Sequence, residues 1–383
     1  MSSLPTRAPR ADILSRAAVI LTAMMFGLTY SLSAPLIAFD LAQRGLSDAV
    51  IGANAAMHAV GVLITAVLLP RLVARLGPRR LILASLAASA AVLVAFSQVS
   101  AIWLWFVLRV LLGMSAEALF VLSETWINAL STEDTRARSM AIYTAALSIG
   151  LALGPWILSL LGTHGPMPYL VGAGLALAAG VFILAPFVSA PAYEKPSVGN
   201  PLRFAAMAPV AIAATVLNAA VETAGLSFLA LYAINLGWAE AQATQLMTVM
   251  MVGAILLQLP IGWLGDTFDR RTLVIGCGVI ATAGAALWPL ALLNPIATYA
   301  LLFVWGGAFV GIYTLTLTIV GSRFSGGNLV GIYAVMGLTW GGGALVGPLA
   351  AGFAMQGTTH GLAWFAVAAC GLFTLVAVLR RSA

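Results

Sequence analysis

The chain has 383 residues, of which 62% are hydrophobic and 8% are charged, and its formal net charge is +6. A soluble domain covers its surface with polar side chains, so this composition excludes an ordinary soluble globular protein. Apolar runs of about 20 residues, long enough to cross a hydrocarbon core of about 30 Å, recur along the whole chain. They predict twelve membrane spans, which lie at approximately residues 17–38, 49–70, 81–98, 102–124, 140–161, 167–189, 207–232, 243–264, 272–292, 297–321, 329–353 and 361–379.

Positive charges are concentrated in alternate loops between these spans. With a cytoplasmic N-terminus, sixteen of the eighteen Lys and Arg residues lie on the cytoplasmic side, Arg44 lies in an outer loop and Arg109 lies within a span. Cytoplasmic loops of membrane proteins carry such an excess, so we predict that both termini are cytoplasmic. The positive charge is therefore interpreted as an orientation signal and not as a nucleic-acid binding surface.

The two halves of the chain repeat one another at an offset of about 192 residues. Gly61 corresponds to Gly253, and the segment GLALGP at 150–155 corresponds to GALVGP at 343–348. Six spans are thus repeated in parallel, because each half begins on the predicted cytoplasmic side. We predict an N-terminal six-helix bundle at 1–189, a polar, proline-rich linker at 190–204 and a C-terminal six-helix bundle at 205–383.

Several short motifs accompany the repeat. The loop GWLGDTFDRR at 262–271 keeps the Gly, Leu, Asp and both Arg of the pattern G-x-L-A-D-R-x-G-R-R, whereas its first-half counterpart has Ala74 in place of the aspartate. RVLLG at 109–113 fits R-x-x-x-G, and 150–155 fits the first part of G-x-x-x-G-P-x-x-G-G. With these motifs the chain resembles the major facilitator superfamily over essentially its whole length, and within it bacterial members that are proton-coupled or similar to drug-efflux proteins. The resemblance implies an all-α transporter with twelve transmembrane helices in two six-helix bundles, related by a parallel pseudo-two-fold repeat.

The resemblance also implies that the two loops form a gate on the cytoplasmic side. It places Asp266 beside the start of the fifth span, near residues 139–140, where the helix dipole favours a negative charge. The alternative is that Asp266 only caps its own turn. Glu124 lies near the cytoplasmic edge of the fourth span, and we expect it within reach of Arg75 or Arg79. The candidate gate residues are Asp266, Arg270, Arg271, Arg75, Arg79, Glu124, Arg136 and Arg138.

Ionisable and amide side chains occur in the middle of a few spans. A charged group at the bilayer centre costs about 2.5–3.5 kcal/mol, so such groups usually face a partner or a cavity. At a rise of about 1.5 Å per residue, His58, Arg109 and Glu222 all lie roughly 10–15 Å below the outer edge. Asn54 shares a helix face with His58, and Asn218 with Glu222, because the members of each pair are four residues apart. This common depth predicts a central site for substrate and protons.

The repeat supplies a control for these polar residues. Glu222 corresponds to Tyr30, and Arg109 corresponds approximately to Phe303, so a six-helix unit does not need either charge to fold. A functional role is favoured for this reason. The alternatives are structural: a buried Arg and Glu could neutralise each other, His58 could serve only as a hydrogen-bond partner, and the tryptophans could only pack or contact lipid. The candidate substrate and proton pathway comprises Glu222, Arg109, Glu117, His58, Asn54, Asn218, Tyr30, Trp305 and Trp340.

Glycine and proline residues mark the candidate moving helices. The segment at 337–352 is rich in small residues, which let helices approach and slide, and it contains a proline, which bends them. Its counterpart in the first half lies at 150–155. The expected hinge and packing positions are Gly150, Gly154, Pro155, Gly343, Gly347 and Pro348.

The sequence predicts a proton-coupled transporter that works by alternating access and exports a small, largely apolar organic compound across the bacterial inner membrane. The partial antiporter motif and the weakly charged spans favour export. One alternative is a proton symporter that imports a small nutrient, with Arg109 as the anchor of an anionic group. A second alternative is a non-transporting assembly or sensor protein with the same fold.

Motifs of other classes of protein are missing from the sequence. We find no G-x-S-x-G, no H-E-x-x-H and no G-x-x-x-x-G-K-[ST], and Cys277 and Cys370 both lie within spans. We therefore expect no enzymatic activity, no metal site and no cofactor, with the proton gradient as the energy source. The expected partners are a small-molecule substrate, protons and the lipid bilayer, and the chain is expected to act as a monomer without nucleic acid.

Overall fold

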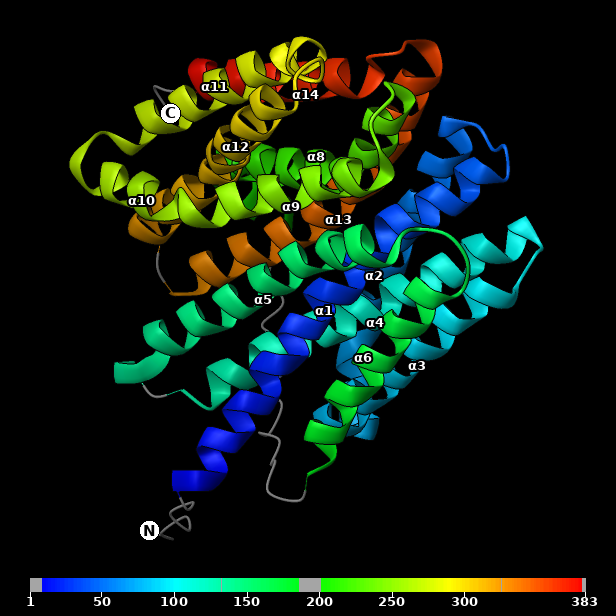
Figure 1. Ribbon diagram of the computed structural model, residues 1–383. Coiled ribbons are helices and arrows are strands. Elements are labelled where there is room, and N and C mark those ends of the chain that lie inside the picture. The colour runs from blue at the N-terminus through cyan, green and yellow to red at the C-terminus, as the bar shows by residue number, and fades with distance from the viewer. Residues whose placement is uncertain (1–8, 132, 186–200, 325, 381–383) are drawn as a thin grey trace, which may run out of the picture. The chain divides into compact units, whose positions relative to one another are not determined.

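The computed structural model describes residues 9–131, 133–185, 201–324 and 326–380. In these ranges the chain forms fourteen α-helices and no β-strand (Figure 1). The helices are α1 (Pro9–Gln43), α2 (Asp48–Leu76), α3 (Pro78–Gln98), α4 (Ile102–Ala129), α5 (Glu133–Leu161), α6 (Met167–Leu184), α7 (Pro201–Met207), α8 (Pro209–Asn235), α9 (Glu240–Leu256), α10 (Gln258–Thr267), α11 (Arg270–Ala291), α12 (Pro295–Arg323), α13 (Gly326–Gly357) and α14 (Gly361–Leu379).

Within the described residues, twelve stretches are long and apolar enough to cross a membrane, which confirms the predicted number of spans. The short α7 precedes the seventh span, and α9 and α10 together form the eighth. These two helices are separated at Leu257, three residues before Pro260, whose ring removes a backbone donor from the helix. The chain is therefore an all-helical, multi-pass membrane protein, whereas the cytoplasmic location of its termini stays a prediction.

Local sequence signals explain several helix starts. Pro78 and Pro209 begin α3 and α8, where the fixed φ angle of proline fits a helix and its missing N–H is not needed. Gly77 turns the chain between α2 and α3 with a φ angle of 75°, which a side chain would disfavour. At the start of α11, Asp269 accepts a hydrogen bond of 2.9 Å from the backbone N–H of Thr272. That N-cap satisfies a donor that the first helical turn leaves unpaired.

Internal packing divides the chain into two compact units. Unit 1 contains α1 as far as Ser33, the chain from Gly61 to Gly154, and α6 with the residues before it from His164. Unit 2 contains Ala34–Val60, Pro155–Thr163 and the second half of the chain from α7 onward. Most of the predicted linker, 190–204, lies outside the described residues, and the predicted domains 1–189 and 205–383 stay a prediction.

The same kind of helix crossing occurs in both units. In unit 1, a Cβ atom on Gly61 of α2 would collide with the carbonyl oxygen of Val110 on α4. In unit 2, a Cβ atom on Gly253 of α9 would collide with the carbonyl oxygen of Phe303 on α12. Only glycine lets two helix backbones come this close, so the positions that correspond in the sequence also form corresponding joints.

The predicted hinge glycines form a second pair of equivalent joints. In unit 1, Cβ atoms on Gly150 and Gly154 of α5 would collide with the backbone and side chains of α1, near Met24 and Ser31. In unit 2, Cβ atoms on the glycines of α13 would collide with α8 at Val216 and Ala220; these glycines are Gly343 and Gly347. Helix α5 therefore crosses α1 as α13 crosses α8.

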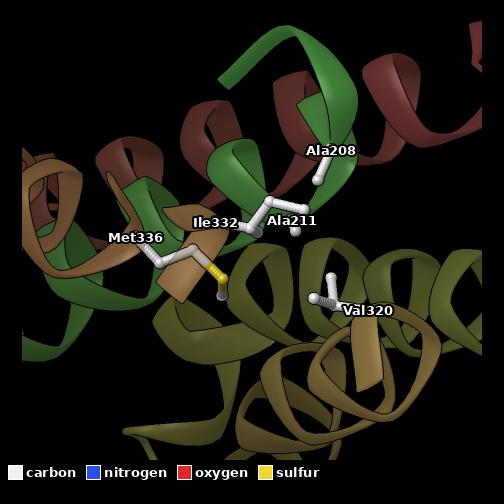
Figure 2. Packing of buried hydrophobic residues seen from close by; sticks show 5 residues of the cluster. All are labelled: Ala208, Ala211, Val320, Ile332 and Met336. Atoms are coloured by element: carbon white, nitrogen blue, oxygen red, sulfur yellow. The ribbon is translucent and has the colours of Figure 1, made fainter. Parts of the chain in front are cut away.

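A buried apolar cluster joins α8, α12 and α13 at the N-terminal end of α8 (Figure 2). The short helix α7 packs on this cluster through Phe204 and Met207, and the ring of Phe204 fills the space beside Gly331 of α13. The start of the second half is thus held to the rest of unit 2 by apolar contacts. The buried members of the cluster are Ala208, Ala211, Val320, Ile332 and Met336.

Candidate functional site

Arg109 is buried in the middle of unit 1. It lies on α4 with a relative exposure of 2%, and its charge interacts with Tyr30 of α1 and Tyr169 of α6. Its Nε and Nη1 atoms have no hydrogen-bond partner among the described residues. A buried guanidinium group with unpaired donors is costly, because those donors have lost their water. Each of these two nitrogen atoms can therefore donate a hydrogen bond to an anionic or carbonyl oxygen of a ligand.

Glu117 and Glu124 lie on α4 two helical turns apart, and their carboxyl groups are near enough to interact. We expected Glu124 to lie within reach of Arg75 or Arg79; the structure gives Arg79 other partners, and the pairing with Arg75 stays a prediction. Its Nε atom donates to the carbonyl oxygen of Ile183 at 3.1 Å, and its Nη2 atom donates to the next two carbonyls at 2.8 and 2.9 Å. The unpaired carbonyls at the C-terminus of α6 attract the cation more directly than a carboxylate on another helix.

Tyr143 of α5 is a residue near Glu124 that we did not single out as a site residue. It is 2% exposed, its hydroxyl group lies 3.1 Å from the hydroxyl group of Ser123, and it donates to the carbonyl oxygen of Phe120 at 3.3 Å. These bonds join α5 to α4 beside the Glu124 carboxyl group, with which Tyr143 also interacts. The signal that could have found it is the dipeptide Ile-Tyr, which recurs in the second half at Tyr333.

Glu222 lies on α8 in unit 2 and is paired with Asn218. The amide nitrogen of Asn218 donates to the Oε2 atom of Glu222 at 3.0 Å, which agrees with the predicted common helix face. The Oδ1 atom of Asn218 has no partner among the described residues. The amide is neutral, so this hydrogen bond fixes the carboxyl group in place without compensating a negative charge.

His58 and Asn54 lie on the part of α2 that belongs to unit 2. They are 5% and 1% exposed, and neither amide atom of Asn54 has a hydrogen-bond partner among the described residues. Ala59, next to His58, packs in one cluster with Ala219 of α8, next to Asn218. The structure therefore brings the polar turn of α2 and the polar turn of α8 together within unit 2.

The two predicted pathway tryptophans have different surroundings. Trp340 of α13 is half-buried and packs against the cluster of α2 and α8 just described. Trp305 is 1% exposed, donates to the carbonyl oxygen of Ala281 at 2.8 Å, and stacks on Phe309 with 4.8 Å between ring centroids. Its N–H group bonds to α11 and its ring stacks within α12, and the placement of Trp305 on the substrate pathway stays a prediction.

The outer ends of several first-half helices also belong to unit 2. A Cβ atom on Gly52 of α2 would collide with the carbonyl oxygen of Pro348, and one on Gly352 would collide with the carbonyl oxygen of Asp48. The carboxylate of Glu240 accepts a hydrogen bond from the backbone N–H of Thr163, which follows α5. These contacts lie at the side that the arginine distribution predicts to be the outer side.

The predicted cytoplasmic gate is described only in part. The carboxylate of Asp266 is 77% exposed, and the Nη2 atom of Arg270 lies 3.6 Å from it. The Nε atom of Arg270 donates to the carbonyl oxygen of Gly265 at 2.9 Å. The side chains of Arg136 and Arg138 lie outside the described part of the chain, and Asp266 and residues 139–140 belong to different units. The gate therefore stays a prediction.

The twelve apolar helices and the buried ionisable groups inside them define a multi-pass membrane protein with polar sites in its spans. The sequence model of the Major Facilitator Superfamily matches the chain twice, at residues 19–213 and 210–383. The chain belongs to this family, as its motifs had indicated.

Relatives from bacteria match over nearly the whole chain. The MFS-type transporter YfkF of Bacillus subtilis is 26% identical over 349 residues, and the match covers 88% of each chain. The MFS-type transporter YcaD of Escherichia coli is 23% identical over 350 residues, which cover 91% of this chain and 90% of that one.

Solved structures share the fold. The nucleoside transporter NupG superposes with a TM-score of 0.77 at 15% identity and covers 96% of this chain and 98% of its own. The D-xylose-proton symporter superposes with a TM-score of 0.72 at 15% identity and covers 95% of this chain and 97% of its own. At this level of identity the similarity shows the fold and does not identify a substrate.

Proposed function

We propose that the protein is a proton-coupled secondary active transporter that works by alternating access, as a monomer, in the bacterial inner membrane. The observation that carries this proposal is Glu222, a carboxyl group inside a span whose described partner is the neutral amide of Asn218, at 3.0 Å. A carboxyl group in this setting can bind a proton from one side of the membrane and release it to the other as its access to water changes.

The joints between helices support alternating access. The glycine-lined crossings of α5 on α1 and of α13 on α8 allow small sliding motions between closely packed backbones. The contacts of Gly52 with Pro348 and of Thr163 with Glu240 would separate each time the outer side opens. Sliding helix crossings together with contacts that break at one end would allow a transporter to expose a single site first to one side of the membrane and then to the other.

Export of a small, largely apolar organic compound is the direction that we propose. The segment at 150–155 supports it through its partial agreement with the antiporter motif, and its glycines form the α5–α1 joint. The charged groups available to a solute in the spans are few, which suits a substrate that is recognised mainly by apolar contacts.

The coupling step is tested by Glu222→Gln in proteoliposomes. A thermal-shift screen of the purified protein against metabolites and drugs, at two pH values, first identifies a transported solute. In the variant, accumulation driven by a pH gradient is expected to fall at least tenfold, while exchange of labelled solute without a gradient continues. The matched control is Asp40→Asn, which removes a partly exposed carboxylate paired with Arg44 at 3.1 Å. Undiminished proton-driven accumulation in Glu222→Gln would exclude Glu222 from coupling.

A second candidate function is proton symport of an anionic solute into the cell. The two unpaired nitrogen atoms of the Arg109 guanidinium group favour it, since they suit a carboxylate or phosphate. In this case Arg109→Gln weakens solute binding at least tenfold, whereas Arg44→Gln does not. Opposite imposed pH gradients distinguish import from export. Binding of a solute without any transport would support the sensor or assembly role instead.

A further inference from the structure

A cavity of about 330 Å³ lies at one end of unit 2, away from Glu222. It is bordered by the starts of α8 and α11 and by the ends of α12 and α14. Three of these helix ends, those of α11, α12 and α14, carry arginines, and all four lie on the side that we predict to be cytoplasmic. The volume is within the range of cavities that hold small ligands, about 300–1,000 Å³.

The polar part of the cavity is positively charged. Three arginines at three helix ends line it, namely Arg271, Arg323 and Arg380, and among the described residues its lining includes no carboxylate. The first turn of α8 contributes Val210 and Ala211, and its N-cap, Ala208, offers no side-chain acceptor to the free N–H groups of that turn. Arginine side chains and an uncapped helix start both favour a phosphate group.

The carboxylates of this region lie on another surface. An open depression of about 530 Å³ shares Arg271 and Arg323 with the cavity and adds Asp266 and Asp269. Asp269 caps α11 there, and Asp266 lies beside Arg270. These two carboxylates border the open depression, and neither belongs to the described lining of the cavity.

Apart from Thr316, the remaining lining of the cavity is apolar. Ala208, Ala211 and Val320 belong both to the cavity and to the buried cluster of Figure 2, in which α8, α12 and α13 meet. Helices α11 and α14, which border the cavity, also expose large apolar side chains along their length; among them are Val279, Ile280, Leu375 and Leu379. A soluble anion would gain nothing from these surfaces, whereas the acyl chains of a lipid would cover them.

We propose that this cavity binds the phosphate headgroup of an anionic phospholipid from the adjacent leaflet, with its acyl chains against α11 and α14. Basic pockets between transmembrane helices on the cytoplasmic side are suited to such headgroups. The bound lipid joins the starts of α8 and α11 to the ends of α12 and α14, and it stabilises this end of unit 2 independently of the transported solute.

The test uses the full-length protein, purified and delipidated in detergent. Phosphatidylglycerol is compared with phosphatidylcholine, glycerol 3-phosphate and inorganic phosphate, by native mass spectrometry for binding and by thermal unfolding for stabilisation. Phosphatidylglycerol is expected to bind at least tenfold more tightly than the other three and to raise the unfolding midpoint. Equal binding of phosphatidylcholine would overturn the requirement for negative charge, and equal binding of glycerol 3-phosphate or phosphate would overturn the assignment to a lipid.

Two double variants locate the site. Arg323→Gln with Arg380→Gln is expected to weaken phosphatidylglycerol binding at least tenfold. Arg71→Gln with Arg80→Gln removes the same charge from exposed positions outside the cavity and leaves binding unchanged. If the first double variant does not fold, Arg323→Lys with Arg380→Lys keeps the charge but loses the paired donors, and a threefold or greater loss of affinity is expected. Equal losses in the cavity variant and in the exposed control would overturn the proposed location.

Discussion

The hairpin between α2 and α3 and the hairpin between α10 and α11 arise from repeated sequence, yet their side chains have different partners. In the first, Gly77 turns the chain, and Arg79 reaches the carbonyl oxygens at the end of α6. In the second, Asp269 caps α11, and Arg270 lies beside Asp266 and Gly265. The first hairpin thus bonds to a neighbouring helix, whereas these bonds of the second hairpin lie within the hairpin itself.

The glycine joints show the opposite behaviour, since they are alike in both halves. Gly61 meets α4 as Gly253 meets α12, although few other residues agree between these helices. The comparison shows that the two halves share the close contacts between helix backbones, although most of their side chains differ. Arg109 and Glu222 each appear in one half only, so the backbone joints that the two halves share do not depend on either charge.

The largest expected effect comes from replacing the glycine at a close helix crossing, in either half, by a larger residue. Gly61→Leu and Gly253→Leu would each force a side chain into a carbonyl oxygen of the facing helix. Overpacking alone costs about 1–3 kcal/mol, and a clash with backbone costs more, so we expect little folded protein from either variant. The measurement is the yield of monodisperse protein in size-exclusion chromatography.

The controls for the joint variants are Gly174→Leu and Gly276→Leu, where a Cβ atom would meet nothing within 4 Å. Both are expected to fold at normal yield. A normal yield for one joint variant but not for the other would disprove the equivalence of the two halves.

An intermediate effect is expected from Arg79→Gln. The change removes hydrogen bonds from a cation to three carbonyl oxygens at the end of α6. Bonds to charged groups contribute about 1.5–3 kcal/mol each in favourable cases, so we expect a loss of about 2 kcal/mol and faster hydrogen exchange in the last turn of α6. The neighbouring Arg80 is exposed, and Arg80→Gln is the matched control. Similar losses in both variants would show that Arg79 acts only through its charge.

The smallest effects are expected in the second hairpin. Asp269→Ala removes the N-cap of α11 and is expected to destabilise the protein by about 1 kcal/mol. Asp269→Ser keeps a side-chain acceptor and is expected to retain most of this stability. Asp266→Asn changes an exposed carboxylate and should lower stability by less than about 0.5 kcal/mol. Thermal unfolding in detergent measures all three. A larger loss for Asp266→Asn than for Asp269→Ala would reverse the roles that we assign to these aspartates.

The sequence was sufficient for features that depend on one helix or on the repeat. The number of spans follows from apolar runs, and the common helix face of Asn218 and Glu222 follows from a spacing of four residues. The partner of Arg79 was not predictable, because it is a helix end about a hundred residues away. The same holds for Trp305, since nothing in its own span indicates a bond to Ala281 on α11. The hydrogen-bond partner of a long side chain is determined by tertiary packing, which the local sequence does not show.

The joints of Gly61 and Gly253 have a consequence for how such proteins diversify. Each glycine meets a main-chain oxygen, which every amino acid provides, so Val110 and Phe303 serve equally well on the opposite side. Substitutions on the facing helix therefore leave the crossing intact, and a substrate site can be rebuilt there while the architecture is inherited unchanged.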